Sequence, residues 1–205
     1  MNYDDLVRRG RITAESLKLD DSHIASRNVS EPCDAIERLQ AELAETNRFY
    51  IDSEFDGHGG PLLSLAIVPE HGTGLHITVD DAPFPKDPWV AENVLPIINS
   101  HAACNAAAIP LLDVGEMLRG VIGDRPSTII ADSPVDIGRF CEAISTDRNG
   151  SWHSFGVPFI RFEVHNIDCW PNDIPGAVQH NAWWDAVALR QRLAAIRERT
   201  DNAGR

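Results

Sequence analysis

The chain has 205 residues, is 43% hydrophobic, and has 31 acidic against 18 basic side chains, a formal net charge of −13. This length and hydrophobic content predict one compact domain with an appendage. Such an excess of acid argues against a protein that binds long nucleic-acid duplexes through a broad basic surface. No apolar run approaches the ~20 residues of a membrane span and no signal segment opens the chain, so we expect no membrane partner and a cytoplasmic location.

The cysteines form no pattern that indicates a metal or redox site. No two of them are spaced as Cys-x-x-Cys, which is the usual signature of zinc and dithiol sites. We therefore expect reduced, mostly buried thiols at Cys33, Cys104, Cys141 and Cys169.

Residues 1–46 differ from the rest of the chain, because they are charged and poor in β-branched runs. One helix is predicted there, with Ser30 as its cap and Pro32 in its first turn. We expect an N-terminal extension that is partly helical over residues 1–46, a folded domain over 47–200 and a tail over 201–205.

Strands and helices are predicted from Phe49 onward. Three strands come first, at Phe49–Phe55, Leu62–Pro69 and Leu75–Val79, and the turns between them favour an antiparallel meander. Helices are expected from Pro88 to about Asn99, around Val114–Ile122, from about Pro134 to Ile144 and from about Ala182 to Glu198, with strands at Ser127–Asp132 and Phe159–Val164. This order predicts an α/β fold in which helices flank a mixed sheet.

Two acids stand at the end of the first predicted strand. Asp52 and Glu54 are two residues apart, so in a strand both carboxylates point to the same face. Like charges held that close need a cation between them or a proton on one of them.

The last predicted helix has a third acid on its packing face. Its apolar stripe consists of Ala182, Ala186, Leu189, Leu193 and Ile196. Asp185 lies on the same stripe, where an acid is costly unless it is paired or binds a metal. His180 lies off the stripe, just before the helix, with Asn181 as a possible N-cap.

In chain order the acidic segments are Asp52-Ser-Glu54, Asp132-Ser-Pro-Val-Asp136 and His180-Asn-Ala-Trp-Trp-Asp185. They resemble the DEDD superfamily of 3′-5′ exonucleases in its DEDDh branch. That branch has Asp-x-Glu on the first strand, an acid early in a helix, and a His five positions before an Asp. The third segment looks particularly like RNase T and oligoribonuclease, and still more like a compact bacterial exoribonuclease family found in mycobacteria. The resemblance covers roughly residues 48–199.

The resemblance implies a ribonuclease H-like fold and a two-metal site. Its metal ligands would be Asp52, Glu54, Asp136 and Asp185, with His180 as the general base. A site of carboxylates without cysteine suits two Mg²⁺ or Mn²⁺ ions. Asp132 is an alternative to Asp136 as the metal ligand of the second motif. Whichever of the two is not the ligand would be a helix cap or a supporting group. A homodimer is implied as well.

The implied substrate is the 3′ end of short single-stranded nucleic acid, RNA favoured over DNA, with release of nucleoside 5′-monophosphates. The expected substrate contacts are Phe55, Ser53 and Trp183. The alternative for Phe55 is a place in the core, and one of Trp183 and Trp184 is expected to pack in the core instead. The chain departs from the family pattern at Phe55-Asp56-Gly57, where Thr-Ser/Thr-Gly is common, and at Val135, where a Phe usually stands. Asp56 is expected to be an exposed turn acid.

Two other classes of function remain open. One is a non-catalytic binding module with a nuclease fold, and the other is a small-molecule phosphodiesterase with the same two-metal chemistry. Acids retained on packing faces argue against the module, because a lapsed site has no physical reason to keep them.

Overall fold

The structure is a computed structural model that describes residues 47–100, 106–147, 149–151, 154–157 and 159–203. The predicted N-terminal extension, together with Cys33 and Cys104, lies outside the described residues. None of the described helices is long and apolar enough to cross a membrane.

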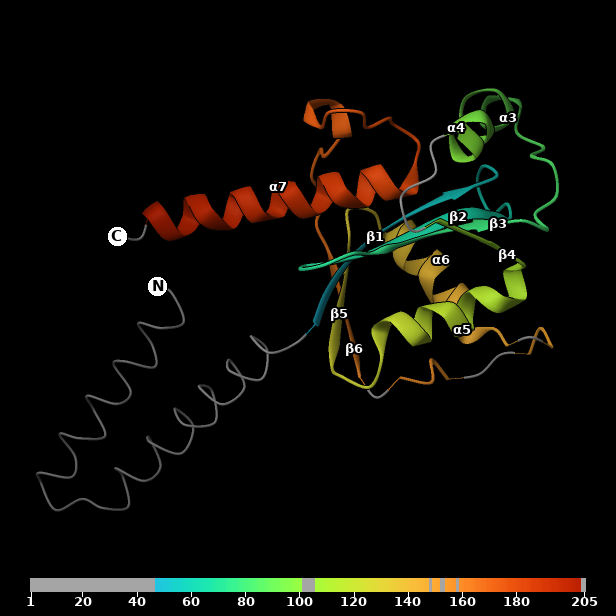
Figure 1. The fold of residues 1–205 in the computed structure, drawn as a ribbon, viewed down its shortest axis with the longest axis horizontal. Helices are drawn as coiled ribbons and strands as arrows, with labels where there is room; N and C mark the ends of the chain where they lie inside the picture. The colour runs from blue at the N-terminus through green and yellow to red at the C-terminus, as the bar shows by residue number, and fades with distance from the viewer. Residues whose placement is uncertain (1–46, 101–105, 148, 152–153, 158, 204–205) are drawn as a thin grey trace, which may run out of the picture. The chain divides into compact units, whose positions relative to one another are not determined.

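A six-stranded mixed sheet forms the centre of the described region, in the order β4-β3-β2-β1-β5-β6 (Figure 1). Its strands are β1 (Asn47–Phe55), β2 (Leu62–Pro69), β3 (Leu75–Val79), β4 (Ala106–Ile109), β5 (Ser127–Ala131) and β6 (Ile160–Val164). β2 is antiparallel to β1 and β3, whereas β3–β4, β1–β5 and β5–β6 are parallel pairs. The predicted antiparallel meander and the predicted mixed α/β sheet are confirmed.

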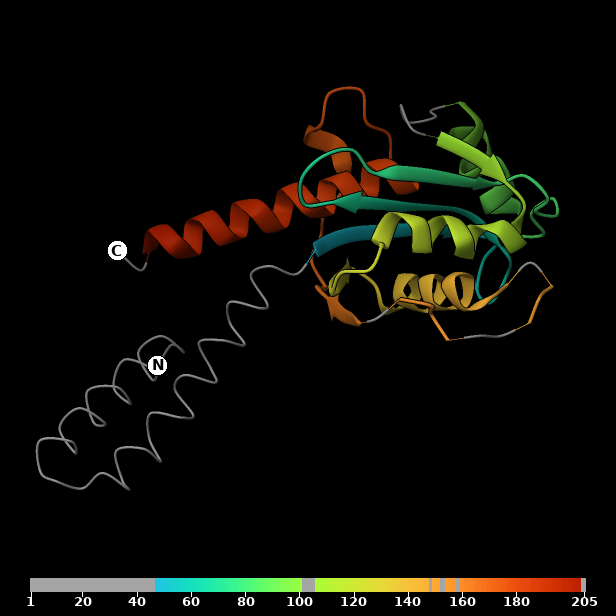
Figure 2. The same cartoon turned by 60° about the horizontal axis from the view of Figure 1, so that its bottom comes forward.

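Helices cover both faces of this sheet. They are α3 (Pro88–Asn93), α4 (Leu95–Ser100), α5 (Leu111–Ile122), α6 (Pro134–Ser145) and α7 (Ala182–Ala203), with a short 3-10 helix η1 (Pro171–Asp173). Figure 2 shows the red helix α7 on one side of the sheet and the yellow-green α5 and orange α6 on the other.

Successive side chains of β1 point to opposite faces of the sheet. Phe49 and Ile51 join the core under α5 and α6, while Tyr50 joins the core under α7. This strand register determines on which face each later residue of β1 lies.

The structure corrects several predicted elements. The helix expected from Pro88 to Asn99 is two helices that break at Val94, because Pro96 has no N–H to donate and its ring disrupts a continuing helix. β4 was not predicted, since its Ala-Ala-Ala-Ile sequence lacks β-branched and aromatic strand formers before its last residue. η1 was not predicted either.

The end of α7 also differs from its prediction. The helix continues to Ala203, so residues 201–203 are helical rather than part of a tail. Ile196 is 39% exposed although it follows the apolar stripe. Figure 1 shows that the last turns of α7 extend past the end of the sheet.

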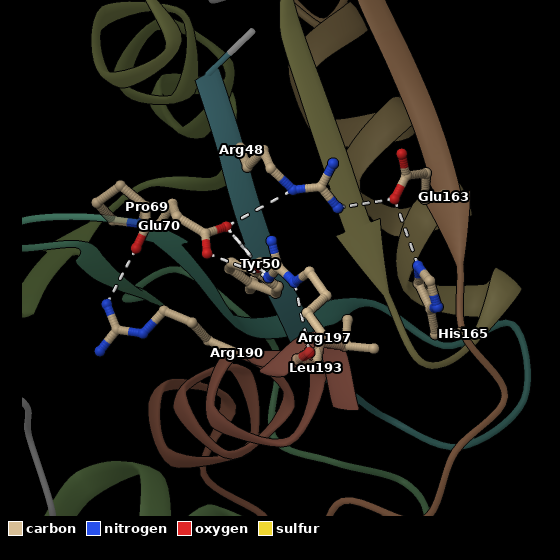
Figure 3. Close-up of polar contacts among 9 residues, drawn as sticks. All are labelled: Arg48, Tyr50, Pro69, Glu70, Glu163, His165, Arg190, Leu193 and Arg197. Carbon is tan, nitrogen blue, oxygen red and sulfur yellow. Dashed lines mark hydrogen bonds and ion pairs between the residues drawn. The ribbon is translucent and has the colours of Figure 1, made fainter. Parts of the chain in front are cut away.

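A polar network fastens α7 to the sheet at the end remote from its first turn (Figure 3). The Tyr50 hydroxyl donates to Glu70 Oε2 at 2.5 Å and accepts from Arg197 Nη2 at 2.5 Å. Arg48 lies between Glu70 and Glu163, at 3.6 and 2.9 Å. The network therefore ties β1, β2, β6 and α7 together around one buried hydroxyl.

Candidate metal centre

A cavity of about 350 Å³ opens where β1 and β5 part. Their parallel pairing ends at Tyr50 and Ile130, after which the two chains diverge. The carboxyl ends of adjacent parallel strands form the usual crevice of an α/β sheet. Asp52 and Glu54 on β1, and Asp132 immediately after β5, line this cavity.

The two acids of β1 lie on the face that α7 covers. Asp52 and Glu54 follow Tyr50 at intervals of two, and their partners on β2 are Ala66 and Ser64. The prediction that both carboxylates share one face is confirmed, and the face is the one that α7 approaches.

Helix α6 adds Asp136 from the opposite side of β1. The Ser133 hydroxyl caps the helix by accepting from the Val135 N–H at 3.1 Å, which places Asp136 in the first turn. Asp136 is only 5% exposed. Its Oδ1 accepts from the Ser53 N–H at 3.1 Å and from the Ser53 hydroxyl at 2.5 Å.

Helix α7 adds Asp185, and small residues allow its close approach. Ala182 and Ala186 are fully buried in the cluster that also contains Ala66 of β2, so no long side chain separates the first turn of α7 from the sheet. The Asn181 N–H donates to Asp185 Oδ2 at 3.2 Å. The helix N-terminus also favours a carboxylate in its first turn.

His180 lines the cavity immediately before α7. Its backbone is left-handed, with φ of 60°, and no other non-glycine residue in the described part of the chain has a positive φ. A side chain in this region carries a local conformational cost, which often accompanies functional sites. The His180 backbone also hydrogen-bonds Asp185.

The five acids form two overlapping groups. Asp52, Asp132 and Asp136 make one, and Asp52, Glu54 and Asp185 make the other. Within each group one ligand atom per residue lies within 4.8 Å of the others. Asp52 belongs to both groups, and both rivals for the second motif are present.

Burial and mutual repulsion disfavour the fully ionised state of these carboxyl groups. Burial first, and then the charges of Asp136 and Glu54, raise the pKa of Asp52 well above its usual value. Burial and the charge of Asp185 raise the pKa of Glu54 to about 8. Burial likewise raises the pKa of Asp185 to about 7. A cation or bound protons must therefore offset the repulsion.

The predicted substrate contacts have different surroundings. Phe55 lines the cavity and lies beneath the Arg139 guanidinium, whose carbon is 4.8 Å from the ring centroid. Ser53 also lines the cavity, but its hydroxyl is occupied by Asp136. Trp183 packs against the core under α7, where Gly74 leaves room for its ring, and it is not among the described residues that line the cavity.

The surroundings of Asp56 differ from its prediction. It is 7% exposed rather than an exposed turn acid, and its two oxygens accept the N–H groups of Lys86 and Asp87, each at 2.8 Å. These bonds lower the pKa of Asp56 below its usual value. The residue holds the segment that leads into α3.

Sequence reasoning missed three residues around the site. Trp89 and Trp170 contact His180, and the Cys169 thiol donates to Asp132 Oδ2 at 3.1 Å. Burial and the neighbouring Asp132 raise the pKa of Cys169, so the thiol keeps its proton and acts as a donor. No local pattern marks these residues, because their contacts depend on long-range folding.

A scan against known protein families finds no match for this chain, and a search among curated proteins finds none either.

Proposed function

We propose that this protein is a metal-dependent 3′-5′ exonuclease of the DEDDh type, which hydrolyses the terminal phosphodiester bond of short single-stranded nucleic acid, RNA in preference to DNA. The observation that carries the proposal is the convergence of separate chain segments on one cavity. Asp52, Glu54, Asp136 and Asp185 come from one strand and two helices, yet they surround the same cavity together with His180.

The donor set fits two Mg²⁺ or Mn²⁺ ions. All candidate ligand atoms are carboxylate oxygens, which hard cations prefer. Asp52 is common to both acidic groups and would be a ligand for an ion held by either one. Asp136 has one oxygen held by Ser53, which is how supporting hydrogen bonds orient a ligand. Asp132 has the same pattern, with Cys169 on one oxygen.

The residues of this chain have distinct roles in the proposed hydrolysis. Two divalent ions, when bound, supply positive charge at the scissile phosphate and activate water. His180 at the cavity wall accepts the proton of the attacking water, because imidazole is the side chain best suited to do so at neutral pH. Phe55 at the cavity wall offers an aromatic face to a terminal base, whereas the Arg139 guanidinium near it is paired with Glu142 at 3.0 Å.

The sheet topology supports this proposal. The order β3-β2-β1-β5-β6, with antiparallel pairs among the first three and parallel pairs after them, is similar to the ribonuclease H-like arrangement. β4 adds an edge strand next to β3. The negative net charge is consistent with a short substrate held at its end rather than along a basic surface. The homodimer stays a prediction.

The test is a nuclease assay with the full chain. A short RNA labelled at its 5′ end and a DNA of the same sequence are incubated with Mn²⁺, Mg²⁺ or EDTA and separated on a denaturing gel. We expect a metal-dependent ladder that shortens from the 3′ end, fastest on RNA. Asp52→Asn should abolish it and His180→Ala should reduce it to a small residual rate, while Asp124→Asn, which changes an exposed acid elsewhere, should leave it unchanged.

Intact oligonucleotides in every lane would contradict the proposal. Turnover of a small chromogenic phosphodiester in the same preparations would then assign the site to a small-molecule phosphodiesterase. Absence of both activities would assign the fold to a binding module.

A further inference from the structure

Two exposed tryptophans flank the His180 ring from separate parts of the chain. Trp89 on α3 has its ring centroid 5.0 Å from that of His180, with the ring planes at 90°. Trp170, between β6 and η1, lies at 6.1 Å with an angle of 71°. Both are edge-to-face contacts, the favoured geometry of aromatic pairs. The tryptophans remain 52% and 53% exposed, so burial in the core does not explain them.

The first tryptophan is held by a chain of hydrogen bonds that starts next to the acids of β1. Asp56 binds the backbone of Lys86 and Asp87 through both carboxylate oxygens. Asp87 Oδ1 in turn caps α3, accepting from the Trp89 N–H at 2.8 Å and the Val90 N–H at 3.4 Å. Trp89 therefore has its backbone fixed relative to the end of β1.

Gly57 makes this close approach feasible. Its φ is 61°, and a Cβ added there would lie 3.1 Å from Asp87 Oδ2. α3 has only six residues, too few for a helix to be stable without tertiary support. Asp56 and Gly57 together are thus the support on which the position of α3 depends.

The second tryptophan is held by its two neighbours in the chain. The Cys169 thiol donates a hydrogen bond to Asp132 at the edge of the acidic cluster. Pro171 is buried and begins η1. Trp170 stands between these two anchored residues, so its ring stays at the cavity wall beside His180.

We propose that Trp89 and Trp170 are positioning residues that hold the His180 imidazole at the acidic cavity, and that Asp56 acts through Trp89. The inference rests on the proposed function, in which His180 takes a proton from water. His180 needs such support, because it lies outside α7 in a left-handed conformation that L-residues disfavour. Neither tryptophan contacts the reacting atoms in this account.

Kinetics of the full chain test the proposal. Trp89→Ala and Trp170→Ala should each lower kcat by about tenfold or more with KM nearly unchanged, because they displace a group that acts only in the transition state. Trp89→Phe should recover part of the loss. Phe84→Ala, which truncates a side chain that is 74% exposed, is the matched control and should leave both constants unchanged.

A double-mutant cycle separates positioning from general damage. In the His180→Ala background the tryptophan substitutions should change the residual rate by less than about twofold, since residues that act through one group are non-additive. Full additivity would overturn the proposal, and so would a raised KM with unchanged kcat, which would make the tryptophans substrate contacts.

A second measurement does not depend on activity. In the Mg²⁺-treated protein with isotope-labelled histidine, the His180 ring resonances are identified by their loss in His180→Ala. Trp89→Ala and Trp170→Ala should shift these resonances more than those of any other histidine, and Phe84→Ala should not. Unmoved His180 resonances would overturn the proposal even in an active enzyme. If the wild type degrades no nucleic acid, the proposed function fails while this result still decides the geometry.

Discussion

At the scale of single residues, the dominant feature is the cost of holding five carboxylates around one cavity. Asp52 contributes to this cost in both acidic groups, and burial raises its pKa well above the usual value. Hydrogen bonds offset part of it, as Ser53 does for Asp136, and burial still raises the pKa of Asp136 to about 6. The rest must come from protons or cations, so the stability of the metal-free protein should depend on pH.

Glu54→Gln tests this dependence. The folded-state pKa of Glu54 is raised to about 8, so its stabilising contribution is complete below the unfolded pKa of ~4.3 and is lost as pH rises towards 8. A neutral glutamine avoids that loss. In EDTA, Glu54→Gln should be about as stable as the wild type at pH 5 and more stable at pH 8, by on the order of 2 kcal/mol. Thermal unfolding at the two pH values measures it.

The control is Glu198→Gln, which changes an exposed acid on α7 and should have the same small effect at both pH values. Equal effects of Glu54→Gln at pH 5 and pH 8 would show that the Glu54 carboxylate is not electrostatically strained.

At the scale of elements, α7 matters most, since it carries Asp185 in its first turn and follows directly on His180. Two kinds of contact hold it. Alanines at its start allow close packing on the sheet, and the Tyr50, Glu70 and Arg197 network fastens it further along. The first contact sets the site geometry, whereas the second contributes to stability.

Tyr50→Phe separates these two contributions. It removes a hydroxyl that bonds to two charged groups but keeps the buried ring. We expect the free energy of unfolding to fall by about 1–2 kcal/mol, as measured by urea denaturation. The stabilisation produced by Mn²⁺ should be retained, because Glu70 and Arg197 still pair directly at 3.1 Å. Undiminished stability, or loss of the Mn²⁺ effect, would contradict this division.

At the scale of the whole molecule, the elements with strong local patterns were predicted from the sequence. β2, for example, is a run of apolar residues between turn signals, and it matches its predicted bounds of Leu62–Pro69. β4 was missed because alanine favours no strand and only pairing with β3 selects one. The break at Val94 was missed because helical spacing continues across Pro96 in the sequence.

The same distinction applies to the site. The sequence draws attention to Asp52, Glu54 and Asp185 because acids on apolar faces contradict their surroundings, and the resemblance indicates Asp136 and His180. Trp89, Trp170 and Cys169 have no such mark, since each is an ordinary residue until the fold brings it to His180 or Asp132. Asp56 likewise could not be recognised as a buried residue, because its hydrogen-bond partners Lys86 and Asp87 lie far along the chain.

Calorimetric titration of the metal-free full chain with Mn²⁺ at pH 7.5 measures whether the converged acids bind divalent cations, as we propose. We predict two ions per chain for the wild type and fewer for Asp52→Asn, because Asp52 belongs to both acidic groups. Proton release should accompany binding, since the carboxyl groups with raised pKa must ionise. Absence of Mn²⁺ binding by the wild type, or binding by Asp52→Asn that equals it, would contradict the account.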